Sequence, residues 1–170
     1  LQYERAHMLW QQLGNSAALA NVLNSMAISL HLRGEYTQAL ALFQQALVKV
    51  QEAGAERIRG YVLAGMGDVH RDLGDYAASE QLYTSALRLA TQVNDGMLTV
   101  YALDALGHTF RLLGDPARGL GLVREALEQA SRHESDQEMG ATRMSLGILL
   151  YEGNDLPAAL VELASACDLL

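Results

Sequence analysis

The feature of this sequence that most restricts its fold is a set of turn-like segments that recurs every 40 residues. The segments are centred on Gly34, Gly74, Gly114 and Asn154, and each is followed by an acidic residue. A left-handed residue that ends a helix is most easily Gly or Asn, and a carboxylate after it can cap the next helix. The spacing therefore predicts helix–turn–helix units that repeat along the whole chain.

A second set of corners, at Gly14, Gly54, Asn94 and Glu134, divides each repeat into two helices of roughly 17 residues. Pro116 and Pro157 each fall in a first helical turn, where proline is tolerated. We expect an all-α fold: a right-handed α-solenoid of antiparallel helix hairpins in one domain, with about four repeats plus a leading half-repeat. The repeats are 15–54, 55–94, 95–134 and 135–170, and residues 1–13 are the second helix of a preceding repeat.

Side-chain size repeats in the same phase. Small residues recur in the first helices at Ala27, Gly67, Gly107 and Gly147, and in the second helices at Ala46, Ala86, Ala126 and Ala166. Larger apolar residues recur at Met26, Met66, Leu106 and Leu146, and at Phe43, Tyr83, Val123 and Leu163. Small side chains let helices approach closely and large ones fill the remaining space. We interpret Gly65, Gly67, Gly119 and Gly121 as packing glycines too, because no strand or Gly-Lys-Ser/Thr motif accompanies them.

These motifs resemble tetratricopeptide repeats. Ala39, Phe43 and Ala46 show the second-helix pattern complete, and the later repeats keep its sizes. The 40-residue period is similar to longer-helix variants in kinesin light chains, cell-polarity adaptors and large bacterial transcription regulators of the maltose-activator kind. The resemblance implies a scaffold that binds a protein or peptide on its concave face. Some members of the family hold a carboxylate with basic residues, but Asn24, Tyr101 and Ala105 stand at those positions here.

Composition restricts the partners. The net charge of −8 repels a phosphate backbone, and Lys49 is the only lysine, so we expect no direct nucleic-acid contact. The stretch from Ala6 to Leu32 lacks charged side chains, but its amides and hydroxyls argue against a membrane span. Cys167 is the single cysteine, and we interpret it as a packing residue in a reducing cytoplasm.

The first helices are expected to line the concave wall. The helical period then predicts which side chains of these helices face a partner groove. The candidate site residues are Asn21, Asn24, His31, Tyr61, Asp68, Arg71, Tyr101, Asp104, His108, Arg111, Met144 and Tyr151, and the same groove also includes Ile28, Asp72 and Ile148. Tyrosine and arginine are frequent in binding hot spots. The pairs Asp68–Arg71, Asp104–His108 and His108–Arg111 also have intrahelical spacing, so they fit a purely structural face equally well.

No residue pattern indicates catalysis. The five histidines have no metal-ligand spacing, and we expect neither enzyme activity nor a metal or cofactor. His70 is interpreted as a core histidine with a hydrogen-bond partner. Two other roles stay open: a sensory or oligomerisation module of a bacterial transcription regulator, with its DNA-binding domain outside this chain, and self-association through apolar terminal helices. The apolar segment 156–170 and the start within a repeat suggest a fragment of a longer protein.

Overall fold

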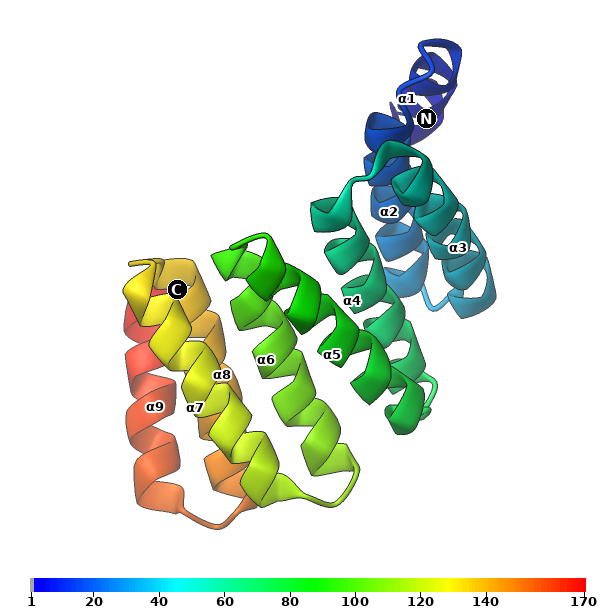
Figure 1. Ribbon diagram of the computed structural model, residues 1–170. Helices are drawn as coiled ribbons and strands as arrows, with labels where there is room; N and C mark the ends of the chain where they lie inside the picture. Colours follow the sequence, from blue (N-terminus) through cyan, green and yellow to red (C-terminus); the bar gives the residue numbers. More distant parts are fainter. Residues whose placement is uncertain (1) are drawn as a thin grey trace. The chain divides into compact units, whose positions relative to one another are not determined.

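A computed structural model describes residues 2–170, except for the side chains of residues 2–4 and 7; Tyr3 and His7 therefore lie outside the described side chains. The described residues form only helices and the turns between them (Figure 1). The helices are α1 (Gln2–Gln12), α2 (Ser16–Leu32), α3 (Tyr36–Ala53), α4 (Glu56–Asp72), α5 (Tyr76–Gln92), α6 (Gly96–Leu112), α7 (Pro116–Arg132), α8 (Asp136–Glu152) and α9 (Leu156–Leu169). The all-α prediction and the predicted helix lengths are confirmed.

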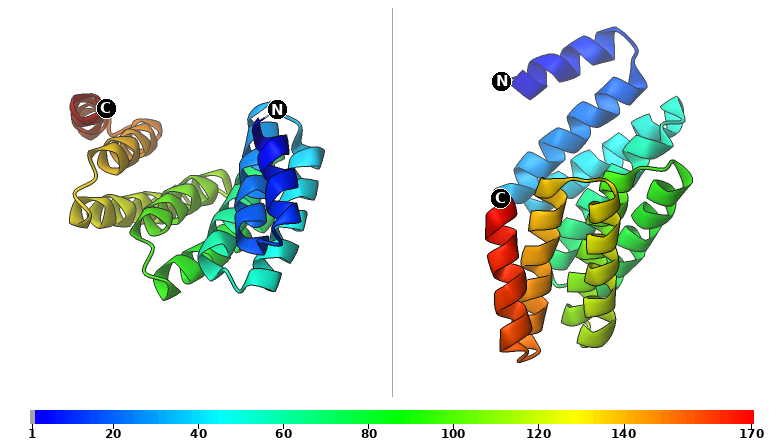
Figure 2. Two further views of the ribbon diagram at one scale, coloured as in Figure 1. Left: turned by 90° about the horizontal axis from the view of Figure 1, so that it is seen from above. Right: turned by 90° about the vertical axis from the view of Figure 1, so that its left-hand side faces the viewer.

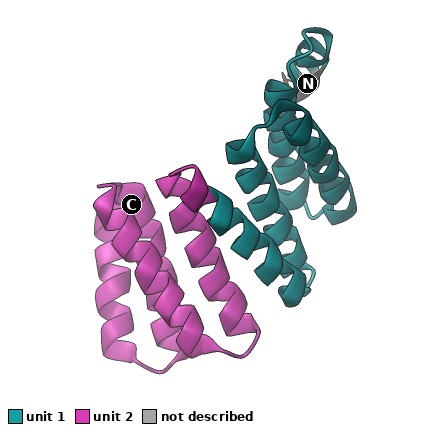
Figure 3. Ribbon diagram, in the orientation of Figure 1, with its two compact units in different colours: residues 1–89 teal, residues 90–170 magenta. Residues whose placement is uncertain are grey.

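The helices divide into two compact units, residues 1–89 and residues 90–170 (Figure 3). In the first unit α2 packs against α3, and α4 contacts both of them. In the second unit α6 packs against α7 and α8 against α9, and α8 also contacts α6 and α7 (Figure 2). Each unit is therefore made of helical hairpins. That the whole chain forms one solenoid domain stays a prediction.

The corners between helices have the predicted backbone conformation. Gly34, Gly74 and Gly114 have φ of +77°, +81° and +87°, and Asn154 has +63°. The second set of corners, with Gly14, Gly54, Asn94 and Glu134, is also left-handed. The turn chemistry read from the sequence therefore sets where the helices end.

Carboxylates cap most of the helices that follow these corners. Asp75, Asp115 and Asp155 each accept a hydrogen bond from the backbone N–H three residues later, as predicted. Glu35, however, makes no side-chain cap and instead pairs with Arg33 at 2.8 Å. Its longer side chain does not reproduce the short reach of aspartate at this position, so this capping prediction is wrong.

The two columns of side chains pack against each other within each hairpin. A Cβ added at Gly67 would lie 2.8 Å from the Tyr83 ring, and one at Gly147 would lie 2.6 Å from Leu163. Gly107 faces Val123 in the same way. Each of these pairs is 16 residues apart, and Ala27, Phe43, Tyr83 and Val123 have no exposed surface. The large residues of second helices therefore pack against the small residues of first helices, as predicted.

Three packing interpretations are wrong. Gly121 is exposed and has open space around it, since it lies two residues, or about 200° of helix rotation, from the packed Gly119. His70 is only half-buried, with Nδ1 3.4 Å from Asp75 at the corner, and is not a core residue. Cys167 is exposed because it lies one position beyond the buried Ala166.

Candidate functional site

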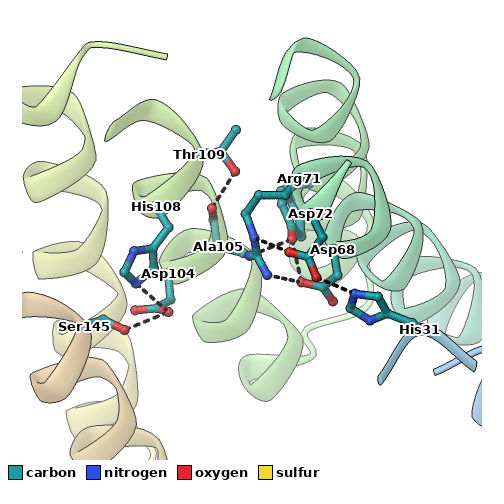
Figure 4. A network of polar contacts seen from close by, with 10 residues as sticks. His31, Asp68, Arg71, Asp72, Asp104, Ala105, His108, Thr109 and Ser145 are labelled. Atoms are coloured by element: carbon teal, nitrogen blue, oxygen red, sulfur yellow. Dashed lines mark hydrogen bonds and ion pairs between the residues drawn. The ribbon is translucent and has the colours of Figure 1, made fainter. Parts of the chain in front are cut away.

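Neighbouring first helices are joined by polar contacts between residues 41 positions apart. His31 Nε2 lies 2.8 Å from Asp72 Oδ2, linking α2 to α4. In the second unit Ser145 Oγ donates to Asp104 Oδ2 at 3.1 Å, and Arg111 Nη1 lies 3.2 Å from Glu152, linking α6 to α8. Figure 4 shows the His31 and Ser145 contacts. Several of the predicted groove residues therefore bind the adjacent repeat within the same chain.

Asp68 and Arg71 form a further cluster with Tyr83 of α5. The buried Tyr83 hydroxyl donates to Asp68 Oδ1 at 2.6 Å and accepts from Arg71 Nη1 at 3.0 Å. Asp68 and Arg71 also form an ion pair at 3.1 Å, and Arg71 Nε lies 3.7 Å from Asp72 (Figure 4). These contacts support a structural role for the Asp68–Arg71 pair, because both side chains bind Tyr83 and so join α4 to α5.

We expect Tyr83→Phe to lower the free energy of unfolding by about 1–3 kcal/mol, since it removes both hydrogen bonds of the buried hydroxyl, to Asp68 and from Arg71, while the Asp68–Arg71 ion pair remains. Thermal denaturation followed by circular dichroism measures the loss. Tyr151→Phe is the matched control, because Tyr151 is 64% exposed. Equal stability of the two variants would contradict a structural role for the Tyr83 hydroxyl.

The exposed surface of the second unit's first helices is mainly apolar. On α6 the stripe consists of Met97, Tyr101, Asp104, His108 and Arg111, and on α8 of Gln137, Ala141, Met144, Ile148 and Tyr151. We call these ten residues the α6/α8 face. Met97, Tyr101 and Tyr151 are 62%, 44% and 64% exposed, and Met144 and Ile148 are also exposed. The polar Asp104, His108 and Arg111 are half-buried, with His108 Nε2 3.9 Å from Asp104 Oδ2.

A pocket of about 240 Å³ opens between α6 and α8. Its lining comprises Met97, Val100, Tyr101, Asp104, Ser135, Gln137, Glu138, Ala141 and Thr142. It is smaller than the roughly 300–1,000 Å³ of a site for a drug-sized ligand. Its size instead suits one apolar side chain presented by a larger partner.

Counting around α6 found two of the pocket residues, Tyr101 and Asp104, and missed the rest. The missed signal is a change of side-chain size at one repeat position. Tyr61 and Tyr101 stand 40 residues apart at this position, and Ala141 takes it another 40 residues later. The small side chain leaves space beside Tyr101. A search for departures from the repeat pattern, in addition to its regularities, would have indicated this position.

The first unit presents a more polar set of predicted residues. Asn21 is exposed, and the buried Oδ1 of Asn24 has no hydrogen-bond partner among the described residues. The Arg57 guanidinium lies 5.8 Å from the centre of the Tyr61 ring. A space of about 350 Å³ lies elsewhere, against Leu47, Gln51, Glu56, Arg59 and Leu63 of α3 and α4, and contains the Glu56–Arg59 ion pair. It includes none of the predicted site residues.

Hydrogen bonds from Lys49 and then Ser16 hold the pKa of Glu52 below its usual value. The Ser16 contact ties the start of α2 to the end of α3, whereas the Lys49 contact lies within α3. In the part of the chain that the structure describes, no group of three or more His, Cys, Asp or Glu residues could hold a metal ion. Among the same residues, no helix has the length and apolar character to cross a membrane.

Family models match two segments of the chain. Residues 19–53 match one model described as tetratricopeptide repeat, and residues 59–132 match another with the same description. Both segments are therefore similar to tetratricopeptide repeats. The α6–α7 hairpin, which carries Tyr101 and Asp104, lies inside the second tetratricopeptide match. No curated protein matches the sequence significantly.

Solved structures share the tetratricopeptide fold at low sequence identity. BtubC (BKLC) from P. vanneervenii is 20% identical with a TM-score of 0.83, over 99% of this chain and 70% of that one. A Rap protein complexed with Competence and Sporulation Factor is 18% identical with a TM-score of 0.75, over 99% of this chain and 44% of Rap. A kinesin light chain-like protein from Podospora anserina with nearly identical TPR-like repeats is 9% identical, with a TM-score of 0.68 over 98% and 83%. These likenesses confirm the fold class.

Proposed function

We propose that this chain is a protein- or peptide-binding scaffold whose second unit binds its partner on the α6/α8 face. The observation that carries the proposal is the pocket between α6 and α8, which opens among exposed apolar side chains on a tetratricopeptide scaffold. Exposed aromatic and methionine side chains around a small cavity are typical of interaction sites. The solved complex of a Rap protein with a factor gives a precedent for binding on this fold.

We propose a smaller set of binding residues than the sequence indicated, with Met97 added. Tyr101 and Met97 border the pocket, while Met144, Ile148 and Tyr151 extend the apolar surface along α8. Asp104 and Arg111 link α6 to α8 through Ser145 and Glu152, and His108 lies 3.9 Å from Asp104 on the same helix. Binding energy should therefore come mainly from Tyr101 and the pocket, because charges already paired must lose those partners before they bind another group.

The test is a selection of short peptides from a displayed random library on the complete chain, followed by fluorescence-anisotropy titration of the selected peptides. Tyr101→Ala should weaken binding about 30-fold, as expected for a hot spot worth about 2 kcal/mol. Ala141→Trp should abolish binding, since the indole fills the pocket. Both variants should keep their thermal stability, because both positions are exposed.

Tyr61→Ala is the matched control. Tyr61 stands at the same repeat position as Tyr101, 40 residues earlier, but belongs to the other unit and contacts Arg57. It should leave the affinity unchanged. Selected peptides that bind wild type, Tyr101→Ala and Ala141→Trp equally well would overturn the proposed site.

A second candidate is a sensory module of a larger transcription regulator, in which binding on this fold would control a separate DNA-binding domain. The likeness to a Rap protein complexed with a factor supports a ligand-responsive role at the level of fold alone. The open reading frame that encodes this segment tests the idea directly. A neighbouring helix-turn-helix or winged-helix domain supports it, and a reading frame of repeats alone removes its basis.

A further inference from the structure

The negative charge of the chain is concentrated in its second unit. Residues 90–170 contain 12 acidic residues and five arginines, a formal charge of −7, whereas residues 1–89 contain eight acidic and seven basic residues, a formal charge of −1. The two units have the same architecture, so this difference does not follow from the repeat pattern. A surface of one sign attracts partners of the opposite sign and repels those of the same sign.

The pocket carries this charge at its edge. Asp104 and Glu138 line it, and no lysine or arginine is among its lining residues. Ser145 and His108 hold the Asp104 carboxylate, whose side chain remains 26% exposed. Glu138 is half-buried in the first turn of α8, where the helix dipole favours a carboxylate. The pocket therefore combines an apolar interior with acidic side chains.

The arginine of α6 and the arginine of α8 each pair with a carboxylate other than Glu138. Arg111 is paired with Glu152 at 3.2 Å, and Arg143 is paired with Glu162 at 2.6 Å. Both arginines are therefore engaged within the second unit. Neither arginine is paired with Glu138, so we expect the cation that faces it to come from the partner.

We infer that the partner is a basic peptide segment: an apolar side chain enters the pocket beside Tyr101 and Met97, and an adjacent lysine or arginine pairs with Glu138. This inference rests on the proposed function and specifies the chemistry of the partner at the same site. A partially desolvated carboxylate beside an apolar cavity discriminates between charges more strongly than an exposed one, because water screens it less. Acidic tails are repelled from the same surface.

The experiment uses the same selection, started from a library with equal numbers of acidic and basic residues. The selected peptides should be enriched in lysine and arginine next to a leucine, methionine or aromatic residue. Replacing the basic residues of the tightest peptide with glutamine should weaken its binding at least about tenfold, and raising the salt concentration should weaken the original peptide. Enrichment in acidic residues, or equal affinity of the glutamine version, would overturn the inference.

Two variants of the protein test whether the preference for a basic peptide arises at the pocket. Glu138→Gln should weaken the basic peptide about fivefold and leave its glutamine version unchanged. Asp136→Asn removes the same charge from the same helical turn, but Asp136 is exposed and does not line the pocket, so it should have a much smaller effect. Equal effects of the two variants would overturn the role of Glu138. If the charge results fail while Tyr101→Ala still weakens binding about 30-fold, the proposed function stands without the charge preference. If Tyr101→Ala has no effect, the proposed function itself fails.

Discussion

Phe43→Ala is expected to lower the free energy of unfolding of the first unit by about 3–5 kcal/mol. The Phe43 side chain has no exposed surface and packs in a core with Leu23, Ala27 and Val62. Its ring also occupies the space left by the missing side chain of Gly65, since a Cβ there would lie 2.6 Å from Phe43 Cζ. Small neighbours cannot extend into the vacated space, so a cavity remains. Urea denaturation followed by circular dichroism measures the loss.

The control for this prediction is Val48→Ala in the same helix. Val48 is 56% exposed, so its truncation should change stability by less than about 0.5 kcal/mol. Hydrogen exchange should show the Phe43→Ala loss in α2, α3 and α4, whose helices contact one another. A loss below about 1 kcal/mol would mean that the hairpins collapse around the cavity and that Phe43 does not set their spacing.

Gly119→Ala should destabilise the second unit by about 2 kcal/mol, although alanine normally favours a helix over glycine by about 1 kcal/mol. A Cβ at Gly119 would lie 2.5 Å from the carbonyl oxygen of Gly107 and 3.3 Å from the backbone nitrogen of Arg111. Backbone atoms cannot rotate away as a side chain can. The substitution must therefore move α6 away from α7.

Gly121→Ala, two residues later in the same helix, is expected to stabilise the chain by about 0.5–1 kcal/mol. Gly121 is exposed, and an added Cβ would meet nothing within 4 Å, so only the gain in helix propensity remains. Thermal denaturation of the two variants side by side tests the contact between α6 and α7. Effects of the same sign would contradict the close approach of these helices.

The fold was predictable because its determinants are local and repeated. A residue such as Gly74 or Asn154 ends a helix for reasons of backbone conformation, and the same residue type 40 positions away repeats the result. The columns that contain Gly67 and Tyr83 follow from the helical period, so their burial could be expected without coordinates. Glu35 differed from expectation because the presence of a carboxylate does not ensure that it reaches the backbone N–H groups of the helix. Gly121 differed because the presence of a glycine does not show which face of the helix it occupies.

The candidate binding surface was less predictable, because it depends on which side chains form contacts with other helices. Asp68 and Tyr101 both stand on first helices, but Asp68 bonds to Tyr83 of the next helix, whereas Tyr101 remains 44% exposed. Contacts between residues 41 positions apart, such as that of Arg111 with Glu152, depend on how far neighbouring helices are shifted along each other. This shift cannot be read from the sequence.

The sequence by itself determined the helices, their ends and the alternation of small and large residues between them, since each follows from backbone conformation and the period of the α-helix. Only the tertiary structure decided that Ala141 leaves a pocket beside Tyr101 and that Asp104 and Glu138 line it together. The physical reason is that a cavity and a pairing between charges are properties of distance between helices. Such distances depend on how all the contacting side chains of two helices pack at once.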